Sequence, residues 1–248
     1  MPYRVKIVET PYMIREYHYL KPVPSNYKQL NKDIDDYEKA LTGEKTHYSI
    51  SRVKEKLALT IQCNVQRWSK FLTFTTKENI KDRAQFLKKW DSFRFKFKHK
   101  YGYNIKYSAV TETQKRGSWH LHVIAYNLTH KLDLKELNRL WVKNPKHGNI
   151  DVKVVDNPKN LFKYMVKYLT KEELKLNKKA VLNSHGLEQP NVTELPEPPN
   201  LQEIYKKPDY QRQWLLYHGD MKKDKINDKN GQLDKAKLNQ CHMKEWHK

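Results

Sequence analysis

The order of secondary-structure patterns between residues 71 and 155 constrains the fold of this chain most. A run rich in β-forming residues, Phe71–Thr76, precedes a long stretch whose apolar residues recur at steps of three and four, as on one face of a helix. The complete order is strand, long helix, two strands, helix and strand, at residues 71–76, 77–100, 104–113, 119–127, 134–142 and 150–155. This order predicts an α+β fold of the ferredoxin-like, split βαβ type. We expect a central antiparallel sheet with helices on one face and a site on the other.

Residues at the ends of these segments support the assignment. Gly102 follows the long helical pattern and is typical of a helix end. Asp133 precedes the second helix as a predicted N-cap, because its side chain can accept a hydrogen bond from a free backbone N–H. Asp156-Asn157-Pro158 predicts the start of a third helix, since proline is favoured in the first helical turn.

A basic turn, Lys115-Arg116-Gly117, joins the two middle strands. Successive strand side chains point to opposite faces, so His120 and His122 project from one face. Glu112 and Gln114 likewise share a face on the preceding strand, and a hairpin would bring the two pairs together. Two imidazoles and an oxygen ligand on rigid strands predict a three-ligand site for a divalent metal.

The charge of the chain favours a polyanionic partner. The 248 residues include 49 Lys and Arg against 28 Asp and Glu, which gives a formal net charge of +21. Residues 1–177 carry 36 of the basic and 18 of the acidic residues, so most of the excess lies in the part that contains the histidine pair. The chain has only two cysteines, Cys63 and Cys241, which are too few and too far apart to suggest a zinc cluster or a disulfide framework.

A segment at 162–171 carries candidate nucleophiles. It contains Tyr-x-x-Lys twice, as Tyr164 with Lys167 and Tyr168 with Lys171. On a helix, Tyr164, Tyr168 and Lys171 would lie on one face. A tyrosine hydroxyl has a pKa near 10, so it is a weak nucleophile unless nearby cations stabilise the phenolate. Packing in a core or on a surface is the alternative role for these tyrosines.

Together these residues resemble the motifs of a known superfamily. The strand Phe71-Leu-Thr-Phe-Thr, the run Glu-x-Gln-x-Arg-Gly-x-x-His-x-His and the doubled Tyr-x-x-Lys occur in that order. They resemble the three motifs of the HUH endonucleases, specifically rolling-circle replication initiators (Rep proteins) of phage and plasmid type. The similarity is closest to the filamentous-phage replication-protein group and covers roughly residues 49–190.

The resemblance implies a site and a reaction. His120 and His122 would hold Mg²⁺ or Mn²⁺, with Glu112 as third ligand and Gln114 as the second candidate. Tyr168 or Tyr164 would attack a phosphate of single-stranded or hairpin origin DNA and form a 5′-phosphotyrosine link and a free 3′-hydroxyl. We rank Tyr168 above Tyr164 as the initiating residue, since relatives with one tyrosine keep the second position. Lys167 and Lys171 would stabilise the phosphate or phenolate, and Lys115 and Arg116 would contact backbone phosphate.

The resemblance also sets the expected domains and partners. We expect an N-terminal arm or hairpin at 1–48, an HUH endonuclease domain at 49–190 and a C-terminal appendage of unknown role at 191–248. The last thirty residues are polar and Lys-rich, which predicts an exposed helix or a poorly ordered tail. The chain lacks the Gly-x-x-x-x-Gly-Lys-Ser/Thr pattern of P-loop helicases, so a separate host helicase is expected. It has no long apolar run and no signal-peptide pattern, which predicts a cytoplasmic protein of a prokaryotic host cell with no membrane partner.

Two other functions remain open from the sequence. An HUH transposase or relaxase would use the same chemistry on another DNA. A non-catalytic domain of the same fold would bind single-stranded nucleic acid by stacking bases on its aromatic residues. Formation of a covalent protein–DNA adduct separates the catalytic functions from the binding function.

Overall fold

The structure is a computed structural model that describes residues 2–23, 47–128, 133–142, 145–154, 161, 165, 167, 168, 181–196, 210–217 and 238–247. The chain divides into two compact units. One is Ile50–Gln189, and the other combines Met1–Ser49 with Pro190–Lys248. The boundaries of the first unit lie next to those expected for the endonuclease domain, 49 and 190.

The unit Ile50–Gln189, called the central unit below, contains a five-stranded antiparallel sheet in the order β6-β3-β5-β4-β7. Its strands are β3 (Lys70–Thr76), β4 (Tyr107–Thr113), β5 (Trp119–Ala125), β6 (Gly148–Val154) and β7 (Val181–Asn183). Helix α3 (Arg83–Tyr101) connects β3 to β4, and α4 (Leu134–Trp141) connects β5 to β6. The first strand of each βαβ unit thus lies beside a strand from the other unit. This arrangement confirms the predicted split βαβ plan.

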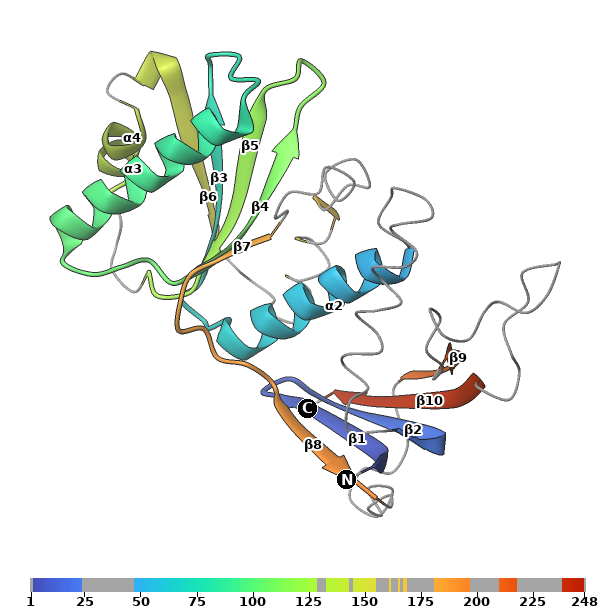
Figure 1. Ribbon diagram of the computed structural model, residues 1–248. Helices are drawn as coiled ribbons and strands as arrows, with labels where there is room; N and C mark the ends of the chain where they lie inside the picture. Colours follow the sequence, from blue (N-terminus) through green and yellow to red (C-terminus); the bar gives the residue numbers. More distant parts are fainter. Residues whose placement is uncertain are drawn as a thin grey trace, which may run out of the picture. The chain divides into compact units, whose positions relative to one another are not determined.

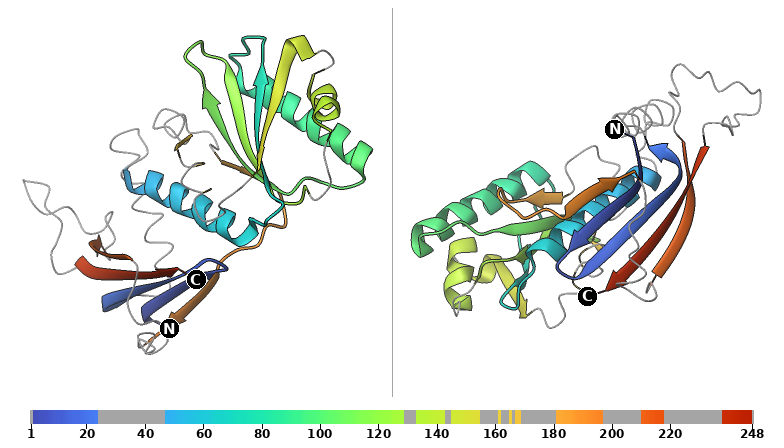
Figure 2. Two further views of the ribbon diagram at one scale, coloured as in Figure 1. Left: turned by 180° about the vertical axis from the view of Figure 1, so that it is seen from behind. Right: turned by 90° about the horizontal axis from the view of Figure 1, so that it is seen from below.

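Both connecting helices cover the same face of this sheet (Figures 1 and 2). Alternate strand residues, such as Leu72 and Phe74 on β3 and Leu121 and Val123 on β5, form one core with apolar residues of α3 and α4. Phe74 lies at its centre, with ring centroids 5.0 Å from Trp90, 4.9 Å from Phe93 and 5.2 Å from Trp141. These edge-to-face contacts are favourable for aromatic pairs. Helices α3 and α4 do not cover the opposite face of the sheet.

Capping residues determine the ends of the helices. Helix α4 begins after Asp133, as predicted, and the Asp133 side chain accepts a hydrogen bond from the Lys135 backbone N–H. Helix α3 begins at Arg83 rather than at the expected residue 77, because Asp82 caps it in the same way at Ala84. The helix ends at Gly102, as predicted, where φ is +79° and glycine is favoured.

Replacing Asp82 by Ala should therefore lower the free energy of unfolding of the central unit by about 1 kcal/mol. Asp91 provides a matched control on the same helix, since its exposed carboxylate only forms an ion pair with Arg94. Asp91→Ala should change the free energy by less than about 0.5 kcal/mol. Urea unfolding followed by circular dichroism measures both, and equal losses would contradict the capping role.

Helix α2 (His47–Asn64) falls mainly within the central unit. Its C-terminal end is fixed by Asn64, whose side chain exchanges two hydrogen bonds of 2.9 Å with the backbone of Glu188. Cys63 is buried beside it, and burial raises the pKa of the thiol to about 11. The thiol is therefore protonated at neutral pH and poorly suited to bind a metal.

The second unit joins the two ends of the chain in one sheet. The strands run in the order β8-β1-β2-β10-β9, and each neighbouring pair is antiparallel. They are β1 (Tyr3–Thr10), β2 (Met13–Val23), β8 (Asn191–Leu195), β9 (Tyr210–Tyr217) and β10 (Leu238–His247). The predicted N-terminal hairpin is thus present, and it pairs with strands from the C-terminal segment that was expected to form a separate appendage.

The prediction of an exposed helix or a poorly ordered tail for the last thirty residues was wrong where the structure describes them. β10 is a strand with partners on both sides, β2 and β9, so ladder hydrogen bonds compensate for its polar sequence. The predicted helix start at 156–158 lies outside the described residues. Among the described helices, none is both long and apolar enough to cross a membrane.

Candidate active site

The β4–β5 hairpin presents the first half of the site. Glu112 pairs with His120 across the two strands. The turn between them is closed by hydrogen bonds from the Gln114 N–H to the Ser118 carbonyl, 2.9 Å, and from the Gly117 N–H to the Gln114 carbonyl, 2.8 Å. Gly117 has φ of +82°, a conformation that favours glycine. The predicted hairpin is therefore confirmed.

Both histidines project from the face opposite α3 and α4. Leu121 and Val123, which alternate with them on β5, are buried in the core under the helices. Strand alternation therefore places His120 and His122 on the other face, together with Thr73 and Phe71 of β3. The predicted separation of helices and candidate site onto two faces of the sheet is confirmed.

Glu112, His120 and His122 form a group suited to a metal. One ligand atom from each residue lies within 4.8 Å of the others. Three ligand atoms about 2.1 Å from a common ion on one face of an octahedron lie about 3 Å apart, so the side chains would close around a bound ion. Gln114 is placed differently, because its side-chain oxygen accepts a hydrogen bond of 3.2 Å from Arg116 Nε. The imidazole nitrogens of His120 and His122 and the carboxylate of Glu112 are donors that fit a divalent cation.

Burial keeps the two imidazoles neutral. It lowers the pKa of both His120 and His122 below the ordinary histidine value, and the neighbouring His122 ring lowers the pKa of His120 further. The carboxylate of Glu112 acts in the opposite direction on both, but burial dominates. At neutral pH the rings therefore hold the lone pairs that a metal requires.

Thr73 on β3 determines the orientation of the His122 ring. His122 Nε2 lies 2.8 Å from Glu112 Oε2, and Nδ1 lies 3.3 Å from Thr73 Oγ1. A hydroxyl both donates and accepts hydrogen bonds. Thr73 can therefore donate to Nδ1 while the proton is on Nε2, and accept from Nδ1 when Nε2 gives its lone pair to a metal. Thr73 was not among the predicted site residues.

Replacing Thr73 by Val should weaken Mn²⁺ binding about tenfold, since partners that orient a ligating histidine typically contribute 10- to 100-fold to metal affinity. Valine keeps the shape of threonine and removes the hydroxyl. Thr73→Ser restores the hydroxyl and should restore most of the affinity. Titration of the protein with Mn²⁺, followed by electron paramagnetic resonance, measures the affinity. Equal affinities for Thr73→Val and the unchanged protein would show that the hydroxyl has no such role.

Tyr168 lies beside this group of residues. Its ring stacks on the His122 imidazole with centroids 3.5 Å apart and planes at 18°. The buried Phe71 ring lies beside both, 5.9 Å from His122 and 6.2 Å from Tyr168. The structure thus brings together the histidine pair and one of the two tyrosines that the sequence singled out. Lys167 is exposed, and Tyr164 and Lys171 lie outside the described residues.

The segment that carries these residues was compared with known protein families. A family model described as Replication-associated protein ORF2/G2P matches residues 69–173. This segment, called the ORF2/G2P segment below for the family that it resembles, makes up less than half of the chain. The resemblance drawn from the three motifs is therefore confirmed at the level of the family. No curated protein and no solved structure gives a significant match to the chain.

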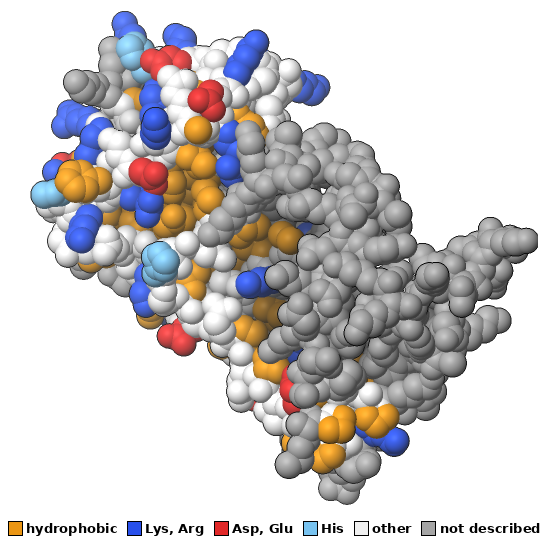
Figure 3. All heavy atoms as spheres, in the orientation of Figure 1, with side chains coloured by type: hydrophobic (Ala, Val, Ile, Leu, Met, Phe, Trp, Pro, Cys, Tyr) orange, Lys and Arg blue, Asp and Glu red, His pale blue; other side chains and the backbone are white. Residues whose placement is uncertain are grey.

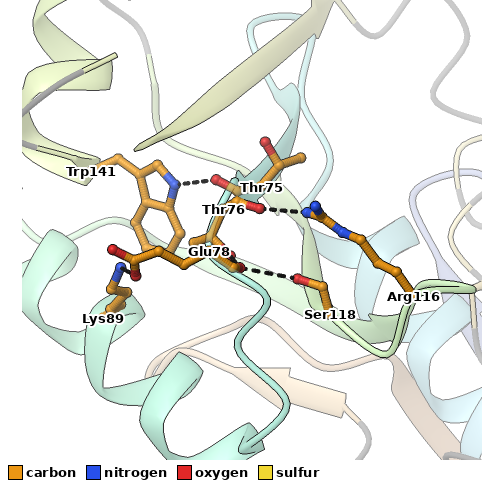
Figure 4. Close-up of polar contacts among 7 residues, drawn as sticks. All are labelled: Thr75, Thr76, Glu78, Lys89, Arg116, Ser118 and Trp141. Carbon is orange, nitrogen blue, oxygen red and sulfur yellow. Dashed lines mark hydrogen bonds and ion pairs between the residues drawn. The ribbon is translucent and has the colours of Figure 1, made fainter. Parts of the chain in front are cut away.

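Arg116, which lies in the ORF2/G2P segment, forms hydrogen bonds within the protein. Its guanidinium donates hydrogen bonds to the backbone carbonyl of Thr76, at 2.7 Å (Figure 4), and to that of Lys77, at 3.4 Å. These contacts tie the β4–β5 turn to the end of β3. Arg116 was predicted to contact DNA phosphate, and the structure gives it at least one additional, structural role. Lys115, the other predicted DNA contact, is exposed in the turn.

The ORF2/G2P segment also contains a pocket that sequence reasoning missed. It has a volume of about 450 Å³ and opens beside His120. Its lining residues come from the end of β3, the β4–β5 turn and the start of β6, and they are Thr75, Thr76, Lys77, Gln114, Arg116, His120, Lys146, Gly148 and Asn149. Lys77 and Lys146 are far apart in a Lys-rich sequence, so nothing in the sequence distinguished them from other surface lysines.

Proposed function

We propose that the protein is a rolling-circle replication initiator that nicks single-stranded origin DNA by attack of a tyrosine and later rejoins the ends. The family match and the group of Glu112, His120 and His122 support an initiator with a metal site. The observation that carries the proposal further is the stacking of Tyr168 on His122. This contact joins a candidate nucleophile to the candidate metal ligands.

The proposed reaction is a transesterification. The Tyr168 hydroxyl oxygen attacks the scissile phosphorus and forms a phosphotyrosine bond while the bond from phosphorus to the 3′ oxygen breaks. The phenol proton is lost and the 3′ oxygen gains one, so the products are a 5′-phosphotyrosine protein and a free 3′-hydroxyl. Mg²⁺ or Mn²⁺ held by His120, His122 and Glu112 would polarise the phosphate and stabilise charge on the leaving oxygen.

The chain's own residues have defined tasks in this proposal. Thr73 and Glu112 orient His122, and Phe71 with His122 fixes the plane of the Tyr168 ring. Lys167 and Lys171 would stabilise the phenolate or the phosphate. Tyr164 would attack a second copy of the cleavage site at termination, forming its own 5′-phosphotyrosine bond and releasing a 3′-hydroxyl. This 3′-hydroxyl then attacks the Tyr168 phosphotyrosine, which joins the ends and frees the Tyr168 hydroxyl. Because one phosphodiester replaces another, rejoining requires no nucleotide cofactor.

The charge of the protein suits a DNA substrate. The net charge of +21 favours binding to phosphate backbones, and this binding should weaken steeply with salt. Lys and Arg side chains are spread over the visible surface of the central unit, with only scattered Asp and Glu (Figure 3). Strand separation would fall to a separate, host-encoded helicase, since the chain has no P-loop pattern.

Selection of covalent adducts from DNA of all sequences tests this function. The full-length protein is incubated with a randomised single-stranded DNA library and Mn²⁺, and complexes that survive denaturation are recovered and sequenced. The proposal predicts adducts that depend on Mn²⁺ and share a common sequence at the cut. Salt-sensitive binding with no adduct under Mn²⁺ or Mg²⁺ would instead favour the non-catalytic binding domain.

A further inference from the structure

The pocket beside His120 has the chemistry of an anion site. Three of its lining side chains, Lys77, Arg116 and Lys146, carry positive charge, and the Asn149 amide adds neutral polar groups. Among the described residues that line the pocket, none carries a carboxylate. Its volume of about 450 Å³ is within the range of small-ligand sites and is large enough for a nucleotide.

The walls of the pocket are built on fixed backbone. Trp141 Nε1 donates to the Thr75 carbonyl at 2.7 Å and Arg116 donates to the Thr76 carbonyl, so both sides of the β3 end are held (Figure 4). Gly148 lies directly against β3, and a Cβ atom at this position would come within 2.5 Å of the Thr75 carbonyl oxygen. A glycine is thus needed where β6 meets this end of β3. The pocket is therefore preorganised rather than formed by chance between loops.

The pocket and Tyr168 lie on opposite sides of His122 along the sheet. Thr73 pairs with His122, while Phe71, which contacts Tyr168, and Thr75, which lines the pocket, are two residues to either side of Thr73 on the same strand face. Phe71 and Thr75 are therefore about 13 Å apart along β3. A phosphate at the histidine pair would have the tyrosine on one side and the pocket on the other.

This placement assigns a polarity to the bound DNA. In phosphoryl transfer the attacking and leaving oxygens lie roughly in line on opposite sides of phosphorus. If Tyr168 attacks from its side, the leaving 3′ oxygen points toward the pocket. We infer that the pocket binds the backbone phosphate of the nucleotide on the 5′ side of the cut, and so retains the strand that ends in the new 3′-hydroxyl. This inference rests on the proposed function and extends it to the orientation of the substrate.

Retention of this strand follows from the charges. After the cut, the piece of DNA with the 5′ phosphate is held by the covalent bond to tyrosine. The piece that ends in the new 3′-hydroxyl has only noncovalent contacts. Lys77 and Lys146 would hold its phosphate without reading its sequence, since phosphate contacts position the strand but carry no base information. The 3′-hydroxyl would then stay near the phosphotyrosine and remain available for rejoining.

Single neutral linkages test the polarity directly. Oligonucleotides with the sequence recovered by adduct selection are made with one methylphosphonate, either at the first phosphate on the 5′ side of the scissile phosphate or at the first on the 3′ side. Affinities are measured by fluorescence anisotropy in EDTA, so that no strand is cut. The proteins compared are the unchanged chain, the Lys77→Ala, Lys146→Ala double variant, and Lys88→Ala as a control on α3, where Lys88 is exposed.

The unchanged protein and Lys88→Ala should each bind the strand with the 5′-side methylphosphonate about tenfold more weakly than they bind the natural strand. For the double variant, the affinities for these two strands should differ by less than about twofold. The 3′-side linkage should affect all three proteins equally. The inference is overturned if the 5′-side linkage weakens binding equally in all three proteins, or if the lysine substitutions change the effect of the 3′-side linkage instead. In either case the adduct still supports the proposed function. If selection yields no adduct from the unchanged protein, both the function and the inference are contradicted.

Discussion

Replacement of Tyr168 by Phe is expected to abolish the first DNA cleavage, with a fall in adduct formation of at least about 10³-fold. Phenylalanine keeps the ring that stacks on His122 and lies beside Phe71, and it removes only the nucleophilic oxygen. The site should therefore keep its packing and its affinity for Mn²⁺. Single-turnover assays on the selected oligonucleotide, resolved on denaturing gels, measure the loss.

Two further variants make this result specific. Tyr101→Phe removes a hydroxyl that bonds to Glu136 on the helical face of the sheet, and it should cleave at the normal rate. Tyr164→Phe should still form the first adduct and should lose the second cleavage, which places a phosphotyrosine on Tyr164. Adduct formation that survives loss of both Tyr164 and Tyr168 would contradict the assigned nucleophiles.

Replacement of His120 and His122 together by Ala is expected to reduce cleavage by about 10³-fold or more, because the site would retain only one of its three strong ligands. Calorimetric titration with Mn²⁺ should show no binding at this site. DNA binding in EDTA should fall less than about threefold, since the phosphate-binding cations are unchanged.

The matched control is His99→Ala. His99 is an exposed histidine at the end of α3, and its ring centroid lies 4.5 Å from that of Phe95 with the planes tilted by 56°. It should leave cleavage and Mn²⁺ binding unchanged. Metal-dependent cleavage at the normal rate by the double histidine variant would show that the metal is bound elsewhere.

Much of the central unit was predictable because local signals and tertiary structure agree there. The run at Phe71–Thr76, the cap at Asp133 and the glycine at Gly102 each specify an element through their own chemistry, and the structure has all three. The shared face of His120 and His122 follows from strand alternation alone. Helix α3 was predicted to begin too early, since Asp82 as N-cap was overlooked among charged residues that suit a helix equally well.

The parts that sequence reasoning missed depend on contacts between distant residues. β10 pairs with β2, more than 200 positions earlier in the chain, and a polar strand of this kind has no local pattern that identifies it. Thr73 was part of a predicted strand, but its role requires the register that places it beside His122. The pocket requires three separate segments, so Lys77 and Lys146 gain meaning only from the fold.

Peptide mapping of the covalent adduct tests the central claim most directly. Trypsin cuts after Lys163, Lys167 and Lys171, so it releases Tyr164 in Tyr-Met-Val-Lys and Tyr168 in Tyr-Leu-Thr-Lys. After nuclease digestion of the DNA, mass spectrometry should find a nucleotide joined through its 5′ phosphate to the Tyr-Leu-Thr-Lys peptide, or to Tyr168 in a longer peptide where cleavage at Lys167 is blocked. A nucleotide on a residue other than these two tyrosines, or no modified peptide from an active preparation, would contradict the proposed mechanism.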